Sequence, residues 1–456
     1  MPPRPDAVPP DDSADLVPSQ GSVPPPFVVD DPSGPAWLTR RRSQARTRAA
    51  QLPLPTVEAE EWRYSRIAEL DVARYGAASS EAAAGEVPAA ASSIVAALGD
   101  LAGVVVLVDG AVVHVELGSD ASASGVGFGS SHDDGIDAAD VLGDAPRHPV
   151  DLFDAWNDAQ GPEPVVLDVP PGVTVEKPFT VVSYASTTET ATFPRIAVRV
   201  GDGAQAALVE VHLSDDVDAL VVPVTTIRVG AAARFRHGVL QDLGRRVWQV
   251  GSLSGSVDRD GHLQVGVAAL GGDYARLRLD CRLEGRGATG DLSSVYLGDG
   301  DQMLDLRTFQ THAAPDTTSH LLFKGGVAGR SHSVYTGLIR IAAGARGAHA
   351  EQTNRNLKLS EEAWAESVPN LEIENNDVRC SHASTVGPVD PDQRFYLESR
   401  GVPTDVADRL IVRGFFDEVL DGFATPVLSA EIACRLDATL ARSADGGVDR
   451  SSEGGS

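Results

Sequence analysis

The sequence predicts a mainly β protein, with a core of stacked short strands between a mixed N-terminal α/β region and a small helical domain. Between residues 165 and 388, apolar and polar residues alternate with the period of two that is typical of strands. Small-residue turns separate these runs, and the region lacks the helices that would connect the strands of a parallel α/β sheet. After Asp390 the pattern changes to the i, i+4 spacing of amphipathic helices.

Composition and periodicity divide the chain into five segments. Residues 1–35 hold 11 of the 29 prolines and almost no periodic apolar pattern, so we expect a disordered tail. Residues 36–164 are expected to form the mixed N-terminal region, 165–388 the β core, and 389–442 the helical domain. Residues 443–456 are rich in Gly, Ser and Asp, and we expect them to be disordered as well.

The N-terminal region contains a basic helix, a hairpin and a loop. Trp37–Ala50 carries five arginines, which we expect on a solvated face that offsets the acidic body. Val104–Val108 and Val112–Val115 flank Asp109-Gly110, a dipeptide that supplies the positive φ angles of a tight hairpin turn. Residues 118–135 are rich in Gly and Ser, which predicts a mobile loop.

Two runs illustrate the alternation in the core. Leu279 lies where Leu and Cys alternate with charged residues, so Leu279 should face the core and its neighbour Arg278 the solvent. The same alternation in residues 207–213 turns the valines inward and Glu210 and His212 outward.

A short strand that runs into a small-residue turn recurs at 198–204, 227–233 and 339–345. Such repeats predict coils that stack as a β-helix or a similar solenoid. A β-sandwich is the alternative that the periodicity leaves open.

The helical domain begins at Asp390, a good N-cap residue that is followed by Pro391 in the first helical position. Gly401 is typical of the residue that ends such a helix. The pattern predicts three helices, over about 391–400, 405–420 and 428–441.

Net charge, the length of apolar runs and the cysteine content indicate which partners and which compartment to expect. A formal net charge of −27 argues against nucleic-acid binding, because an acidic surface repels phosphates. The N-terminus lacks an apolar signal segment, and no run approaches the ~18 apolar residues that cross a bilayer. Three scattered cysteines are too few for a disulfide framework, which fits a reducing compartment. We therefore expect a cytoplasmic protein with no membrane partner.

Several common catalytic motifs are absent from the chain. The P-loop, nucleophile-elbow and His-Glu-x-x-His patterns are absent. A β-helix carbohydrate lyase or hydrolase is an alternative, but it would need a groove of acidic residues with aromatic platforms. Only 5% of the residues are aromatic.

Cys380 and His382 are the candidate site residues just before the helical domain. They lie two apart in a strand-like run, so both should point to the same side. An imidazole is a common metal ligand, so His382 is a candidate metal ligand and Cys380 a weaker candidate. The alternatives are hydrogen bonding at an interface for His382 and packing as a small hydrophobe for Cys380.

A longer pattern spans the junction between core and helices. Its residues are Cys380-Ser381-His382, Thr385, Gly387, Asp390, Gln393, Phe395-Tyr396-Leu397, Ser399-Arg400-Gly401 and Gly414-Phe415-Phe416. This pattern resembles that of the SufB/SufD family, the scaffold subunits of the SUF iron-sulfur cluster assembly system. Ala383 and Ser384 replace the usual Gly-Ala of the family, which is a change between small residues.

The resemblance implies a right-handed parallel β-helix and a non-enzymatic scaffold that aids iron acquisition and cluster assembly. It implies pairing with a SufB-like subunit through the β-helix ends, with His382 at the joint. His382 would be a ligand of iron or of an iron-sulfur cluster, with Cys380 as a weak candidate, and the metal would be held transiently and shared with that SufB-like subunit. One imidazole cannot hold a cluster, so the partner would supply thiolates. Residues 363–367 lack the thiol of a SufB-type chain, and His382 stands where such chains have Glu, so the chain resembles the SufD type.

The resemblance also implies that the C-terminal helices dock the SufC-like ABC ATPase, with aromatic anchors supplying most of the binding energy. The residues expected to bind this partner are Phe395, Tyr396, Arg400, Phe415 and Phe416. A purely architectural subunit with no metal contact stays open as an alternative function. The sequence also leaves open whether a flavin binds.

Overall fold

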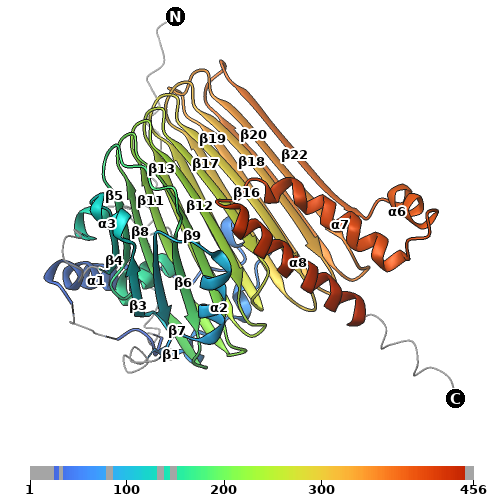
Figure 1. Cartoon of the computed structure of the whole chain (residues 1–456), viewed down its shortest axis with the longest axis horizontal. Helices are drawn as coiled ribbons and strands as arrows, with labels where there is room; N and C mark the ends of the chain where they lie inside the picture. The colour runs from blue at the N-terminus through green and yellow to red at the C-terminus, as the bar shows by residue number, and fades with distance from the viewer. Residues whose placement is uncertain (1–24, 30–33, 79–85, 131–137, 144–150, 447–456) are drawn as a thin grey trace, which may run out of the picture.

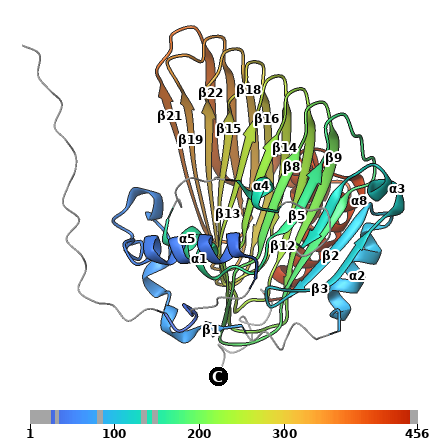
Figure 2. The ribbon, with the colours of Figure 1, turned by 90° about the vertical axis from the view of Figure 1, so that its left-hand side faces the viewer.

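The computed structural model describes residues 25–29, 34–78, 86–130, 138–143 and 151–446. Within these residues the chain folds into a parallel β-solenoid, in which successive core strands alternate between two facing sheets (Figures 1 and 2). The mainly β core is confirmed, and the β-sandwich is excluded because its sheets would be antiparallel.

Each turn of the solenoid adds one strand to each sheet. From the last turn to the first, the main path of sheet A is β21 (Trp364–Ile373), β19 (His332–Ile341), β17 (Met303–His312), β15 (Tyr274–Leu283), β13 (Trp248–Val257), β11 (Val224–Val229), β8 (Arg195–Val200), β5 (Val165–Val169) and β4 (Gly127–Ser130). The short strands β1 (Gly76–Ala77), β7 (Thr190–Thr192) and β10 (Ala219–Val221) pair beside this path. Sheet B is β22 (Arg379–Pro388), β20 (His349–Lys358), β18 (Thr318–Val327), β16 (Thr289–Gly298), β14 (His262–Ala269), β12 (Arg234–Asp242), β9 (Gln205–Ser214), β6 (Phe179–Ala185), β2 (Gly103–Val108) and β3 (Ala111–Leu117).

The core strands pair in register, so side chains at equivalent positions stack along the solenoid axis. Leu279 on β15 is paired with Leu253 on β13 and with Thr308 on β17. All three residues are at most 2% exposed. The predicted inward face of Leu279 is therefore confirmed.

Arg278, predicted to face the solvent, lies instead beneath the N-terminal segment. Its guanidinium pairs with Asp280 and with Glu61, each at 2.7 Å, and lies 3.9 Å from the centre of the Phe309 ring. Only 15% of the side chain is exposed. The prediction is wrong because chain from outside the core covers this face, which alternation within the strand does not indicate.

The predicted faces of β9 are also wrong. Glu210 and His212 point into the solenoid and are 3% and 2% exposed, whereas Val209 and Val211 lie on the outer face. Helices α2 (Ala89–Leu98) and α8 (Pro426–Gly446) cover that outer face. Both faces of β9 are dry, so its polar residues do not mark the solvent side.

The hairpin of β2 and β3 is confirmed. Asp109 and Gly110 have φ angles of 48° and 87°, the left-handed conformation that a type I′ turn requires. The Asp109 carboxylate accepts hydrogen bonds of 2.7 Å from both the backbone N–H and the hydroxyl of Ser186. These bonds tie the hairpin turn to the chain that leaves β6.

The first end of the solenoid is closed by the chain itself. β3 and β4 run antiparallel to their neighbours, and α3 (Ser119–Ala123) lies between them in the sequence. The ring of Phe128 on β4 packs 4.9 Å from that of Phe179, and both residues are at most 3% exposed. Gly103 permits this closure, because a Cβ there would stand 2.7 Å from the Phe128 ring. The predicted mobile loop at 118–135 is therefore wrong as far as Ser130.

A second group of N-terminal helices lies beside sheet A (Figure 2). They are α1 (Ala36–Ala49), α4 (Ala138–Leu142) and α5 (Leu152–Gln160), with the short helices η1 (Glu60–Trp62), η2 (Ile67–Glu69) and η3 (Val72–Arg74). The arginines of α1 do not all form the expected solvated face. Arg42 is 5% exposed and donates to Gly161 O at 2.9 Å, while Arg41 pairs with Asp158 at 3.0 Å. These arginines attach α1 to α5 and to the residue that follows it.

The C-terminal helices are α6 (Pro391–Glu398), α7 (Thr404–Leu420) and α8. Asp390 caps α6 by accepting from the Asp392 N–H at 2.9 Å, and Gly401 follows that helix with φ 81°. α7 and α8 pack on the outer face of sheet B, whereas α6 extends beyond β22 (Figure 1). Lys324 on β18 fixes α7 by donating to Phe415 O at 2.7 Å and pairing with Glu418 at 2.5 Å.

The proline-rich segment 1–35 and the tail 443–456 lie largely outside the described residues. Where the structure describes the first of them, Phe27 is 1% exposed and packs 5.1 Å from the Trp156 ring, contrary to the expected disorder. An isolated phenylalanine has no periodicity that would predict this burial. At the other end, α8 continues to Gly446.

Two substitutions on β15 test the assignment of its faces. Leu279→Ala should lower the free energy of unfolding by about 2–5 kcal/mol, because it leaves a cavity in the interior. Arg278→Ala should cost about 1 kcal/mol through the lost ion pairs and ring contact. Urea midpoints of both variants check this order. A larger loss for Arg278→Ala than for Leu279→Ala would contradict it.

Candidate functional site at the open end

The last turn of the solenoid has no covering element among the described residues. β21 pairs only with β19, and β22 pairs only with β20, so both are edge strands. Their outer backbone N–H and C=O groups have no ladder partner, which makes this end a template for another strand. The other end is filled by Phe128 and its neighbours. The two ends of the solenoid therefore differ.

His382 lies on this open end. It is the in-register partner of Gln352 on β20, a residue that points into the solenoid and is 1% exposed. Parallel neighbours in register point to the same side, so His382 faces the interior of a last turn that has no lid. Its side chain is exposed. The imidazole is accessible to a molecule that docks on this end.

Cys380 lies on the same face of β22, as the spacing predicted, but in a more apolar setting. It is paired in register with Ala350 and packs with Ile339 and Ile341 at the apolar corner of the open end. Burial raises the pKa of the Cys380 thiol. A thiol kept protonated in this way is a poorer metal ligand than a thiolate.

The residues expected to bind a partner through the helical domain separate into two groups. Phe395 and Tyr396 on α6 are 71% and 55% exposed, and the Arg400 guanidinium lies 3.9 Å from the Tyr396 ring centre. Phe416 is fully buried and Phe415 is partly buried, both packed against the outer face of sheet B. Phe416 is thus a packing residue, which corrects its assignment as a contact residue. The sequence could not separate the two rings, because they are adjacent on one helix.

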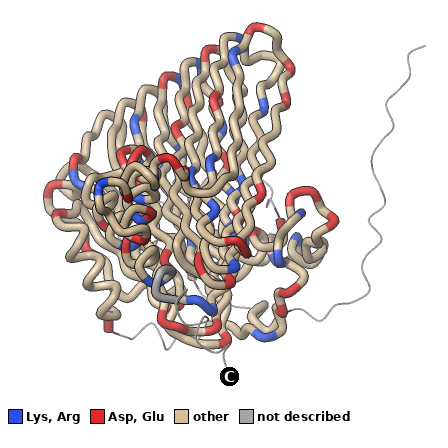
Figure 3. The backbone as a smooth tube through the Cα atoms, turned by 90° about the vertical axis from the view of Figure 1, so that its right-hand side faces the viewer, with Lys and Arg blue, Asp and Glu red and all other residues tan. Residues whose placement is uncertain are grey.

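The described surface carries charges of both signs. Figure 3 shows acidic and basic positions interspersed over the turns and helices that the structure describes. Within those residues, no group of three or more His, Cys, Asp or Glu side chains is arranged to hold a metal ion. None of the described helices is both long and apolar enough to span a membrane.

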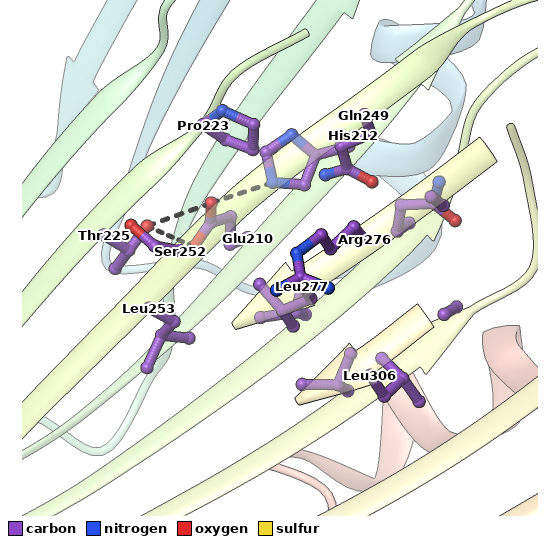
Figure 4. A pocket seen from close by; sticks show the side chains of 15 residues that line it. Glu210, His212, Pro223, Thr225, Gln249, Ser252, Leu253, Arg276, Leu277 and Leu306 are labelled. Carbon is purple, nitrogen blue, oxygen red and sulfur yellow. Dashed lines mark hydrogen bonds and ion pairs between the residues drawn. The ribbon is translucent and has the colours of Figure 1, made fainter. Parts of the chain in front are cut away.

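A second polar cluster lies inside the solenoid and was missed in the sequence. One oxygen of the Glu210 carboxylate accepts from His212 Nε2 at 2.8 Å, and the other accepts from the Thr225 hydroxyl at 2.9 Å (Figure 4). The second of these oxygens also lies 3.0 Å from His237 Nε2. A cavity of about 30 Å³ adjoins this group, with Gln249 also in its wall. That volume holds about one or two water molecules.

The buried carboxylate of Glu210 stays ionised. Burial by itself would raise its pKa, but the His212 and His237 side chains hold the pKa of Glu210 well below its usual value. Thr225 comes from sheet A, so its bond to Glu210 links the two sheets across the interior. All four residues are at most 3% exposed, so we assign the cluster to the stability of the solenoid.

Comparison with known proteins identifies the family. The model for the SufBD core domain of SUF system FeS cluster assembly matches residues 183–415, about half of the chain. The chain therefore belongs to the SufBD family. The match contains β22, α6 and most of α7, the elements that carry the junction pattern.

Individual relatives agree with this assignment. The chain is 36% identical over 217 residues to an iron-sulfur cluster assembly SufBD family protein of Mycobacterium tuberculosis, a match that covers 46% of this chain and 55% of that protein. It is 27% identical over 399 residues to the iron-sulfur cluster assembly protein SufD of Bacillus subtilis, covering 85% and 90%. Against SufD of Escherichia coli the values are 32% over 167 residues, covering 37% and 40%. The chain thus spans about half the length of the mycobacterial relative and most of the Bacillus relative.

The interior cluster predicts a specific pH dependence. The pKa of Glu210 is lower in the folded state than the ~4.3 of an unfolded chain. Its stabilisation is therefore present above pH ~4.3 and is lost as the pH falls through the folded-state value. Glu210→Gln should lower the free energy of unfolding by about 3–5 kcal/mol at pH 7. It should also flatten the loss of stability below pH 4.3, measured by urea titration at several pH values.

The exposed Glu351 provides the control for this prediction. Glu351→Gln should leave both the stability at pH 7 and the acid slope close to those of the wild type. Equal acid slopes for the wild type and Glu210→Gln would contradict the assignment of an ionised, stabilising carboxylate.

Proposed function

We propose that this chain is a non-enzymatic, cytoplasmic scaffold subunit of a SUF iron-sulfur cluster assembly complex. It pairs with a SufB-like subunit through the open end of its solenoid, and it docks a SufC-like ATPase through its C-terminal helices. Membership of the SufBD family supports the general role. The observation that carries the finer proposal is the place of His382, exposed on the inward face of the last strand at the end that lacks a lid.

Pairing at the open end fits the chemistry of that surface. β21 and β22 present two parallel rows of backbone donors and acceptors, which strands of a second solenoid would satisfy. Ile373 and Val386, 46% and 45% exposed, lie on these strands and would lose apolar exposure in the joint. Until another chain pairs with this end, these backbone groups and apolar side chains remain exposed to water.

Iron or a cluster would be cargo at this joint. His382 offers a neutral imidazole nitrogen, a good ligand for iron. A single imidazole does not hold a cluster, so thiolates would come from the SufB-like subunit. Cys380 contributes less, since burial keeps its thiol protonated and it packs in the apolar corner.

Docking of the ATPase is assigned to α6 and its surroundings. Phe395 and Tyr396 are the most exposed aromatic residues described, and α6 has no buried residue of its own. Phe415 on α7 is only partly buried against sheet B and is a further candidate contact. Deletion of all three helices would not test this proposal cleanly, because α7 and α8 cover sheet B.

The metal role of His382 is tested by iron and sulfide content. His382→Ala should leave the fold and the subunit ratio of the three-component complex unchanged, because one exposed side chain contributes little to a large interface. The iron and sulfide bound per reconstituted complex should fall severalfold. Cys380→Ser should have a smaller effect. Unchanged iron in the His382→Ala complex would reduce this chain to an architectural subunit.

The docking role of α6 is tested by affinity for the ATPase. Phe395→Ala combined with Tyr396→Ala should weaken binding more than tenfold, because exposed aromatic anchors contribute about 2 kcal/mol or more each. Leu54→Ala, which removes an exposed apolar side chain in the N-terminal region, is the matched control. Binding of the double variant within twofold of the wild type would place the docking surface elsewhere.

A further inference from the structure

Gln352 is a buried amide without a hydrogen-bond partner. It is 1% exposed, and neither its Oε1 nor its Nε2 is bonded within the part of the chain that the structure describes. An orphan donor or acceptor of this kind costs about 1–3 kcal/mol. A residue that keeps two such atoms inside a solenoid requires an explanation.

The opposite sheet makes room for this amide. Gly337 on β19 lies across the interior from Gln352, and a Cβ there would stand 2.5 Å from Nε2 and 2.3 Å from the Tyr335 hydroxyl. That hydroxyl already bonds to Thr308 at 2.9 Å. Gly337 therefore leaves space for the amide of Gln352 but forms no hydrogen bond with it.

The next layer toward the open end consists of Pro369 and His382. Pro369 is paired with Gly337 in sheet A, and His382 is paired with Gln352 in sheet B. Proline has no N–H and its ring offers no polar group, so within this pair only His382 carries a polar side chain. Ser367, two residues before Pro369 on the same strand, also has a buried hydroxyl without a described partner, but it is in register with Tyr335 and not with Gln352. Side chains paired in a parallel sheet lie ~4.8 Å apart, and an exposed imidazole is free to change rotamer. A ring N–H of His382 can thereby donate to Gln352 Oε1.

We propose that Gln352 is the positioning residue of His382. Its Oε1 accepts one ring N–H, which fixes the tautomer and leaves the other ring nitrogen unprotonated and directed to the joint. Histidines that bind metals ordinarily donate their second nitrogen to an oxygen acceptor in this manner. The iron-binding consequence rests on the proposed function, whereas the hydrogen bond and the tautomer do not.

Gln310 provides a matched control. It is also a glutamine that is 1% exposed with both amide atoms unpartnered, but it lies on β17 in sheet A, paired with Cys281 and Ile339. It has no register relation to His382. Replacement of either glutamine by methionine keeps the length and removes the amide.

The first test measures the tautomer of His382 in the full chain without metal. Nitrogen-15 spectra of histidine-labelled protein distinguish the two neutral tautomers, and the signal missing from His382→Ala assigns the residue. The wild type should show one dominant tautomer and Gln352→Met a mixture of both. Gln352→Glu, which retains an acceptor, should restore one tautomer, and Gln310→Met should match the wild type. An unchanged ratio in Gln352→Met, or an equal change in Gln310→Met, overturns the proposal.

The second test separates this proposal from the proposed function. Ferrous iron binding to the complex with the SufB-like subunit should weaken about tenfold in Gln352→Met and remain unchanged in Gln310→Met. If His382→Ala leaves iron binding intact while the tautomer depends on Gln352, the metal role fails and the positioning role stands. If His382→Ala weakens iron binding but Gln352→Met changes neither iron binding nor the tautomer, the positioning role fails alone.

Discussion

The backbone ladder of a solenoid is satisfied only by the turns before and after. Each strand of this chain pairs in register with its counterparts one turn away, so an end of the stack always leaves two strands half paired. The two ends of this solenoid differ in whether these strands are covered. At the first end the chain folds back as β3, α3 and β4 and fills the interior with aromatic and aliphatic side chains. At the last end it turns away into α6, and β21 and β22 stay open.

The rest of the molecule is arranged around that asymmetry. Helices α2, α7 and α8 pack on the outer face of sheet B, and the N-terminal segment packs on the outer face of sheet A. Residues of this chain itself therefore cover both outer faces. Along one inward-facing row of sheet B, Leu292 and Leu321 are followed toward the open end by Gln352 and then His382. A row that becomes polar at the open turn suits an interface whose partner brings ligands of its own.

Much of this architecture could be predicted from the sequence, because a solenoid is built from a local repeat. Alternation indicated the strands, and Asp390, Pro391 and Gly401 indicated where α6 begins and ends. The orientation of strands that are covered on both faces was harder to predict. In β9 the valines face the helices and Glu210 faces the interior, since neither face meets water.

Contacts between distant segments were not predictable from periodicity. Arg278 is covered by a segment more than 200 residues away, and Phe416 packs on sheet B while its neighbour Phe415 stays partly accessible. The position of His382 followed from its strand-like run, but the openness of its turn required the whole topology. The proposed partner of Gln352 likewise rests on register and burial, which the sequence alone does not give.

We propose that the open end is the joint with a SufB-like subunit. Hydrogen exchange of this chain, alone and with that subunit, tests this proposal, because pairing would bond the free amides of the edge strands. The account predicts slower exchange in Trp364–Ile373 and Arg379–Pro388 on binding, with no change in Ala111–Leu117 or Gly127–Ser130 at the closed end. Protection confined to other segments, with β21 and β22 exchanging as in the free chain, would contradict it.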